Sequence, residues 1–190
     1  MGVEVRRITD YCRFEELYHF HMKKDFPESE LRPLSNIQRL WEQNKYECYG
    51  LYEGEMLLGY AGFYKNGNNF LFDYFAIVKE QRNKGLGSRF LQDLKGCITG
   101  ACCVLVEIED ADKARDQDKR CIRKRRQAFY GRNGYRITEV TARVFGEDYR
   151  ILELPTGPSH SKAVIEELYS SFYQDILPPH IFRTSFQITS

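Results

Sequence analysis

The stretch between Phe70 and Ile108 constrains the fold of this chain more than any other. It begins with an aromatic and β-branched pattern at Phe70 to Val78, passes through glycines into apolar residues at helical spacing, and ends with an apolar run at Ala101 to Ile108. A strand, a helix and a second strand in this order predict a parallel crossover, because a tight turn cannot join two parallel strands. We therefore expect an α/β chain.

The flanking segments predict antiparallel strands. Val3 to Ile8 has strand composition, and Tyr46 to Tyr52 with Met56 to Tyr64 is expected to form a hairpin around a Glu-Gly turn. A closing hairpin is expected from Tyr135 to Val140 with Arg143 to Leu154. The predicted sheet is thus mixed and mostly antiparallel.

Helix-capping residues predict the remaining helices. Thr9 or Asp10 is expected to begin the first helix, Ser35 a second and Ser159 a C-terminal one. The tail after Pro179 is expected to add an edge strand. These signals divide the chain into a domain at residues 1–154 and a C-terminal helix and tail at 155–190, packed on the same domain.

Composition excludes several classes of protein. The 190 residues carry 28 Lys and Arg against 27 Asp and Glu, a net charge of +1, and 42% hydrophobic residues, enough for a core. The longest apolar run, Ala101 to Val106, is far shorter than the roughly 20 residues of a membrane-spanning helix. Because the first seven residues lack an apolar leader, we expect a cytoplasmic protein that does not bind membranes.

The cysteines and histidines do not form a metal-binding pattern. The six cysteines include no Cys-x-x-Cys, and His19 and His21 have no acidic or thiol partner at metal-site spacing. A chain with a large core needs no disulfides. We expect reduced thiols and no metal.

The segment Arg82–Ser88 lies where the Phe70 to Val78 strand turns into a helix, which makes it a candidate anion site. The first amides of a helix have no internal hydrogen-bond partner, and the helix dipole is positive there. Gly85 and Gly87 allow a phosphate to approach the backbone, and Arg82 and Lys84 add positive charge. The dinucleotide-binding fingerprint is excluded because Phe90 replaces its last glycine, and no Gly-Lys-Ser/Thr exists for a nucleotide triphosphate loop.

Further along the chain comes Phe129-Tyr130-Gly131, followed by the turn Arg132-Asn133-Gly134. With this pair of motifs, residues 3–154 resemble the GNAT superfamily of acetyl-CoA-dependent N-acetyltransferases. The resemblance implies a mixed, mostly antiparallel twisted sheet whose central parallel pair splays around acyl-CoA and is flanked by helices. It also implies acetyl-CoA as co-substrate and a primary amine of a small molecule or peptide as acceptor.

The resemblance assigns roles to particular residues. Ile77 and Val78 would offer backbone groups to the pantetheine arm and acetyl carbonyl, and Tyr130 would stand beside the thioester sulfur. Many family members bind the pantetheine with an Asn several residues before the Phe-Tyr pair, where this chain has Arg123 to Arg125. The diphosphate would be held by Arg82, Asn83, Lys84, Gly85, Leu86, Gly87 and Ser88.

The chemistry of acetyl transfer suggests the catalytic candidates. The departing thiolate needs a proton, for which a tyrosine with a pKa near 10 is suited, so Tyr130 is the predicted acid. The developing oxyanion needs an N–H, which the strand near Val78 is expected to supply. Asp73 and Glu107, on the two strands of the crossover, are the predicted bases. The alternatives are a core aromatic for Tyr130 and, for each carboxylate, a salt bridge to a residue such as Lys84.

Four further expectations concern the partners and the alternative function. The acidic group Glu107, Glu109, Asp110 and Asp112 is a hypothetical steering surface for a cationic amine. A non-catalytic acyl-CoA-binding or sensor module is the alternative function. Nucleic-acid binding through Lys119 to Arg126 is disfavoured by the near-neutral net charge. We expect a monomer or a homodimer.

Overall fold

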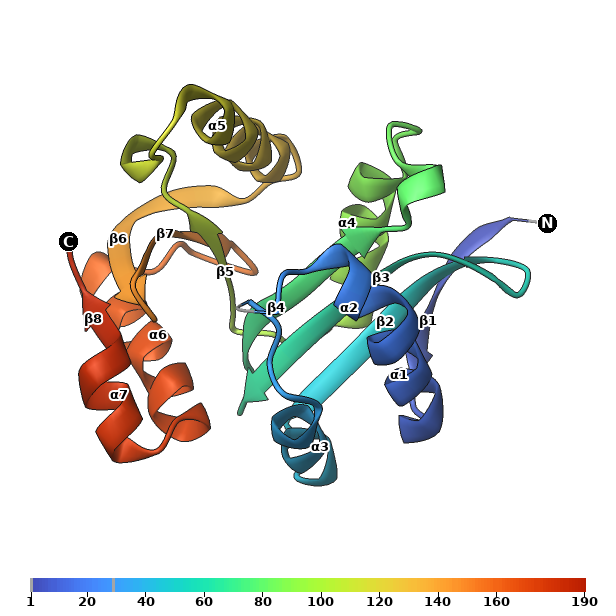
Figure 1. Ribbon diagram of the computed structural model, residues 1–190, viewed down its shortest axis with the longest axis horizontal. Coiled ribbons are helices and arrows are strands. Elements are labelled where there is room, and N and C mark those ends of the chain that lie inside the picture. Colours follow the sequence, from blue (N-terminus) through green and yellow to red (C-terminus); the bar gives the residue numbers. More distant parts are fainter. Residues whose placement is uncertain (1, 29) are drawn as a thin grey trace. The chain divides into compact units, whose positions relative to one another are not determined.

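The computed structural model describes residues 2–28 and 30–190, and its parts form two compact units (Figure 1). The first unit contains the chain up to residue 65 together with Phe72–Thr99, and the second contains Asn66–Leu71 with Gly100–Ser190. The fold is mixed α/β, with mostly antiparallel strands and one parallel pair, as predicted. No helix in the described ranges is both long enough and apolar enough to cross a membrane.

The first unit is built on a sheet in which β1, β2 and β3 pair antiparallel and β4 follows β3. Cys48 in β2 lies opposite Ile8 in β1 on one side and Gly62 in β3 on the other. The predicted Glu-Gly turn joins β2 to β3, with Gly54 at a φ of +60°. The strands are β1 (Val3–Ile8), β2 (Tyr46–Glu53), β3 (Met56–Asn66) and β4 (Asn69–Ile77).

Helices cover both faces of this sheet. Asp10 begins the first helix, because its carboxylate accepts a hydrogen bond from the Cys12 amide at 2.9 Å. The prediction for Ser35 as the cap is wrong: the helix starts two residues earlier, directly after Pro33, whose fixed φ suits a helix entry. The elements are α1 (Tyr11–Leu17), η1 (Tyr18–Met22), α2 (Lys23–Asp25), α3 (Leu34–Glu42), η2 (Lys79–Gln81) and α4 (Leu86–Cys97).

The two faces are covered by different helices. The α1 and α2 helices lie across one face (Figure 1), where the ring of Phe14 contacts Tyr46 with centroids 5.8 Å apart. On the other face, Phe90 of α4 contacts Phe75 at 5.5 Å. The β4 strand is therefore packed against helices through large aromatic side chains.

The second unit contains the strand order β5-β7-β6-β8, with the first residues of β4 beside β5. The Cys102 amide, next to β5, donates to the Asn68 carbonyl at 2.8 Å. The closing hairpin turns at Phe145 and Gly146, both with positive φ, so the predicted break between Val140 and Arg143 is wrong and lies inside a strand. The strands are β5 (Cys103–Glu109), β6 (Arg136–Val144), β7 (Glu147–Leu154) and β8 (Phe186–Ile188).

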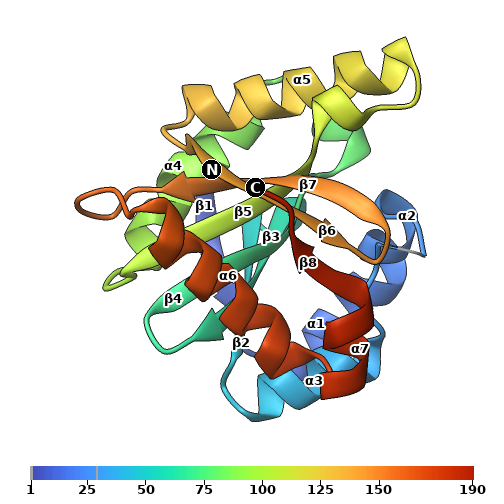
Figure 2. The ribbon, with the colours of Figure 1, turned by 90° about the vertical axis from the view of Figure 1, so that its left-hand side faces the viewer.

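The helices α5 and α6 lie on opposite faces of this second sheet (Figure 2). The cap of α6 is Ser161 and not the predicted Ser159, because the Ser161 hydroxyl accepts from the Val164 amide. The expected edge strand is confirmed, since β8 pairs with β6, but a short helix precedes it that the prediction lacks. The helical elements are η3 (Ala111–Lys113), α5 (Gln117–Arg132), α6 (Lys162–Ile176) and α7 (Pro179–Ser185).

Candidate functional site

The glycine-rich loop before α4 presents helix amides in the way that an anion site requires. Gly85 is the N-cap of α4 and adopts the left-handed conformation, with a φ of +78° and open space around its α-carbon. As a glycine, the N-cap residue makes no side-chain hydrogen bond to this helix end. The amides of Leu86 and Gly87 belong to the first helical turn, which has no internal acceptors. Arg82–Ser88 thus fits a diphosphate group.

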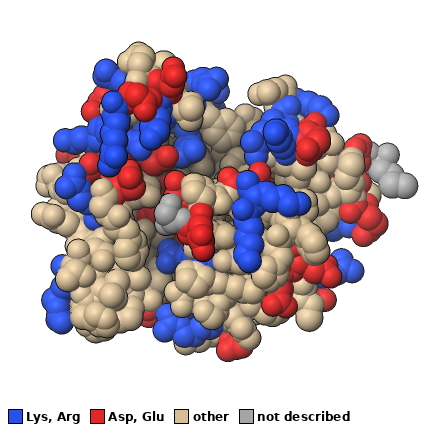
Figure 3. Space-filling model, in the orientation of Figure 1, with Lys and Arg blue, Asp and Glu red and all other residues tan. Residues whose placement is uncertain are grey.

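Basic side chains surround the start of α4 (Figure 3). Lys84 is exposed, and its Nζ donates to the Gln81 side chain at 2.8 Å. Arg82 has about half of its side chain exposed (47%) and donates to Asp25 and to the Ile77 carbonyl. The positive charge of both side chains adds to the positive end of the helix dipole, and both effects favour an anion at this loop.

At the end of β4, the Val78 amide and the Ile77 carbonyl already form hydrogen bonds within the chain. The Val78 amide donates to the Leu58 carbonyl at 2.9 Å, and the Ile77 carbonyl accepts from Arg82 Nε at 2.8 Å. In this arrangement the Val78 N–H is used inside the first unit, so it can donate to an acetyl oxygen only if that bond opens. The sequence could not indicate this, because the pairing partner lies on another strand.

Within the first unit, β4 bulges. Phe72 and Phe75 are three residues apart yet have ring centroids only 5.5 Å apart, whereas a regular strand would put them on opposite faces. Asp73 and Tyr74, between them, both contact Arg32 in the segment between α2 and α3. This loss of alternation is the signature of a β-bulge.

Asp73 lies in a buried ion pair. Its side chain is 5% exposed, both carboxylate oxygens accept from Arg32 Nε at 3.1 Å, and the Tyr46 hydroxyl lies 3.3 Å from one of them. The burial raises the pKa of Tyr46 well above its usual value, with Asp73 adding to the effect. The structure thus gives Asp73 the salt bridge that was its alternative interpretation, with Arg32 as partner.

Glu107 lies on β5 against the C-terminal helix. The hydroxyls of Tyr169 and Tyr173 both donate to its carboxylate, the latter at 2.8 Å. Tyr169 is fully buried, and burial, together with the Glu107 charge, raises its pKa well above the usual value. Both tyrosines come from α6, beyond the residues that carry the family resemblance.

Tyr130 lies near the end of α5 and is 6% exposed. Its ring makes edge contacts with Phe129 at 5.4 Å and with Tyr135 at 5.1 Å. Burial raises the pKa of Tyr130 to about 12, with Arg126 opposing the shift. Its phenol therefore remains protonated at neutral pH, as a proton donor must.

Three residues of the acidic group pair with arginines, which argues against the steering hypothesis. Asp112 pairs with Arg120 at 3.2 Å, and Asp110 is buried with Arg150 at 3.3 Å. Glu109 pairs with Arg126. Part of the basic run in α5 is thus used in ion pairs within the second unit.

One group of potential metal ligands occurs among the described residues: Cys103, Glu153 and His160, whose ligand atoms lie within 4.8 Å of one another. The Glu153 carboxylate already accepts from the His160 ring and from Arg136. Burial raises the pKa of the Cys103 thiol to about 12, helped by Glu153, so the thiol is protonated. The three residues form a hydrogen-bonded cluster that needs no ion.

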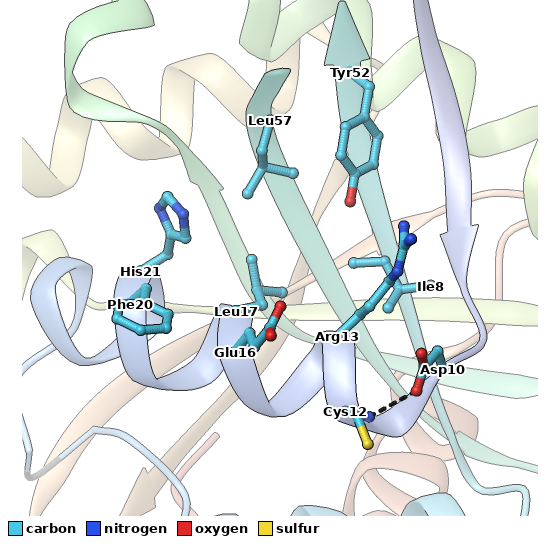
Figure 4. Close-up of a pocket in the computed structure, with 10 residues that line it drawn as sticks. All are labelled: Ile8, Asp10, Cys12, Arg13, Glu16, Leu17, Phe20, His21, Tyr52 and Leu57. Carbon is cyan, nitrogen blue, oxygen red and sulfur yellow. Dashed lines mark hydrogen bonds between the residues drawn. The ribbon is translucent and has the colours of Figure 1, made fainter. Parts of the chain in front are cut away.

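A cavity of about 620 Å³ lies beside α1 in the first unit (Figure 4). Arg13 extends from α1 towards Tyr52, and the Glu16 carboxylate lies at the same opening. The cavity therefore carries groups of both charges. Its lining residues are Ile8, Asp10, Cys12, Arg13, Glu16, Leu17, Phe20, His21, Tyr52 and Leu57.

Comparison with known proteins identifies the family. The model of the acetyltransferase (GNAT) family matches residues 13–135, and the chain belongs to this family. A comparison with curated protein sequences found no match. The match to the family model confirms the resemblance drawn from the glycine motif and the Phe-Tyr pair.

Solved structures share the fold at low identity. A GNAT-family acetyltransferase from Bacteroides thetaiotaomicron is 16% identical, with a TM-score of 0.69, covering 91% of this chain and 95% of the other. The ribosomal-protein-S18-alanine N-acetyltransferase from Escherichia coli is 14% identical, with a TM-score of 0.61 and coverage of 85% and 98%. A GNAT-family acetyltransferase from Elizabethkingia anophelis with acetyl-CoA bound is 15% identical, with a TM-score of 0.55 and coverage of 80% and 97%.

Proposed function

We propose that this protein transfers the acetyl group of acetyl-CoA to a primary amine of a small molecule or peptide, by direct attack in a ternary complex. The observation that carries the proposal is the loop Arg82–Ser88, where the first-turn amides of α4 and two basic side chains would hold a diphosphate group. Family membership supports acetyl-CoA as the donor. The related structures include the ribosomal-protein-S18-alanine N-acetyltransferase, which supports an amine as the acceptor.

Residues of the chain would carry out the proton transfers of the reaction. The acetyl donor brings a thioester, whose C–S bond breaks as the amine nitrogen bonds to the carbonyl carbon. Tyr130, protonated at neutral pH, gives its proton to the departing sulfur. The proton lost by the amine passes to a carboxylate, directly or through water. The phenolate is then reprotonated by solvent.

Glu107 is the better candidate for that carboxylate. Its partners in the second unit, Tyr169 and Tyr173, are neutral phenols that can rotate their hydroxyls when the carboxylate takes up a proton. Both oxygens of Asp73 are instead held by the permanently charged Arg32. We assign Asp73 a structural role in fixing the segment between α2 and α3.

One set of observations favours a second function, a non-catalytic acyl-CoA-binding module. Asp73, Glu107 and the Val78 amide each have hydrogen-bond partners within the chain. A sensor would keep the diphosphate site and need none of these groups to react. The two functions differ in one product, free CoA thiol.

A turnover assay separates the two functions. Acetyl-CoA is incubated with the protein and a panel of aminoglycosides, polyamines, amino acids and lysine or N-terminal peptides, and free thiol is measured. The enzyme releases thiol above background with at least one amine, in amounts equal to the acetylated product. A module that binds CoA by calorimetry but releases no thiol is a sensor. Absence of CoA binding refutes both functions.

A further inference from the structure

Asp25, a residue that neither the sequence nor the comparisons single out, is tied to the diphosphate loop. It is the last residue of α2, and its side chain is only 14% exposed. One carboxylate oxygen accepts from Arg82 Nη2 at 2.8 Å, and the other accepts from the Tyr60 hydroxyl at 2.9 Å. All three residues belong to the first unit.

Arg82 is held at two points. Its Nε donates to the Ile77 carbonyl at the end of β4, also at 2.8 Å, while Nη2 donates to Asp25. A guanidinium has five N–H donors, so donors remain on a side chain that is 47% exposed. The guanidinium therefore bridges α2 and the end of β4 and still has hydrogen atoms for an external anion.

We propose that Asp25 is a positioning residue that holds the Arg82 guanidinium ready for the diphosphate of acyl-CoA. This inference rests on the proposed function, because it needs the diphosphate to bind at Arg82–Ser88. Fixing a free arginine side chain costs conformational entropy, and a side chain fixed during folding has already lost that freedom. Tyr60, which is 1% exposed, anchors the carboxylate from the β3 side.

The Asp25 carboxylate also has an opposing effect on CoA affinity, and the experiment distinguishes the two. A carboxylate beside Arg82 also lowers the positive charge that an anion encounters. If competition for Arg82 dominated, replacing Asp25 by a neutral residue would tighten CoA binding. If positioning dominates, the same change weakens it.

The experiment compares two ligands by calorimetry: CoA and pantetheine, which lacks the diphosphate. The variants are Asp25→Asn, Arg82→Gln, the double variant and Tyr60→Phe. Asp93→Asn is the matched control, because Asp93 is an exposed carboxylate paired with Arg89 on α4. Thermal unfolding of each variant shows that it is folded.

We expect Asp25→Asn to weaken CoA binding about tenfold, in line with the loss of a charge-assisted hydrogen bond, and to leave pantetheine binding unchanged. Tyr60→Phe weakens CoA binding in the same direction by less. In the Arg82→Gln background, Asp25→Asn has no further effect, because the two residues act as one unit. Asp93→Asn matches the wild type.

Three results overturn the proposal. A positioning role for Asp25 is excluded if Asp25→Asn binds CoA as tightly as the wild type or more tightly. It is also excluded if the variant loses affinity for CoA and for pantetheine equally. Additive effects of Asp25→Asn and Arg82→Gln exclude action through Arg82. A wild-type protein that binds CoA no more tightly than pantetheine refutes the diphosphate site itself, and the proposed function falls together with the role of Asp25.

Discussion

Among the single residues, Tyr130 and Tyr135 provide a matched pair of buried phenols whose rings lie 5.1 Å apart. Only Tyr130 has a proposed chemical role. Tyr130→Phe is expected to lower kcat about 100-fold, within the range for the loss of a general acid, without changing CoA affinity. Tyr135→Phe is expected to keep most activity. The readout is thiol release in both variants, and equal rates in the two would contradict the acid role.

The pH profile tests the same residue. Because burial raises the pKa of Tyr130 to about 12, the phenol stays protonated up to that pH and its titration causes no loss of kcat below pH 10. The sign follows from the role, since an acid works only while it holds its proton. The assignment would be contradicted if kcat of the wild type fell with a midpoint near pH 9 and this fall were absent in Tyr130→Phe.

The buried carboxylate of Glu153 is expected to stabilise the fold. Burial alone would raise its pKa, but hydrogen bonds from His160 and Arg136 outweigh burial and lower the pKa. A lowered folded pKa stabilises the fold above the unfolded value near 4.5, and this stability disappears as pH falls through the folded pKa. Glu153→Gln should therefore cost about 2 to 3 kcal/mol at pH 7, less than a fully enclosed ion pair because Arg136 is 38% exposed.

Urea unfolding at pH 7 and pH 3 measures this effect. The difference in the free energy of unfolding between wild type and Glu153→Gln is expected to be smaller at pH 3 than at pH 7, because the wild-type carboxyl begins to take up a proton. Glu147→Gln is the control, since Glu147 is exposed and its pair with Arg123 is long, at 3.6 Å. A difference that stayed constant with pH would show that the Glu153 charge is not the source of the stability.

Local signals in the sequence identify individual residues only in part. The predictions for Tyr130 and Arg82–Ser88 come from short motifs, the Phe-Tyr pair and the glycine motif that carry the family resemblance. Asp25, Arg32 and Tyr169 could not be predicted in this way, since each acts on a residue more than 40 positions away. Only folding brings such pairs together.

At the scale of elements, the conformation of Gly85 decides how α4 begins. An L-residue with a side chain in the left-handed region costs about 1 kcal/mol, and the surrounding space is open, so Gly85→Ala adds strain without a clash. We expect this variant to lose about 1 kcal/mol of stability and also CoA affinity. Gly67→Ala is the control, because Gly67 has a φ of +60° and open space but lies in another turn.

Calorimetry and urea unfolding read out this comparison. Both variants are expected to lose similar stability, whereas only Gly85→Ala loses CoA affinity, because the cap directs the first-turn amides. Equal CoA affinity in the two variants would mean that the start of α4 does not hold the ligand.

Most elements follow from the sequence because their signals are local. Hydrophobic spacing gives α1 and α4, and Glu-Gly gives the turn between β2 and β3. The errors concern boundaries: Ser35 and Ser159 are capping types, but the helices begin after Pro33, which makes no side-chain cap, and after Ser161, which does. The family resemblance implies a bulge in the strand before the glycine motif, but the aromatic run does not place it at Phe72 to Phe75, because such a run looks the same on either face.

At the scale of the whole molecule, the C-terminal residues fold as part of the second unit. The buried side chains of α6 are Ile165, Tyr169, Phe172, Tyr173 and Ile176. At about 1.5 to 3 kcal/mol each, their removal would match the entire stability of a typical domain. A chain of residues 1–154 is therefore expected not to unfold cooperatively.

Circular dichroism melts check this expectation. A shorter deletion, of residues 179–190, removes α7 and β8, which contribute no fully buried side chain, and should keep cooperative unfolding at a lower Tm. A 1–154 chain that melted like the wild type would show that residues 155–190 are dispensable for the fold.

The most direct test of the central claim is amide hydrogen exchange at the start of α4 with and without CoA. The amides of Leu86 and Gly87 lie in the first turn of the helix and have no intrahelical acceptor, so they exchange readily in the free protein. If the diphosphate docks on this loop, CoA slows exchange at residues 85–88 much more than pantetheine does. CoA that binds without slowing exchange there would contradict the proposed site.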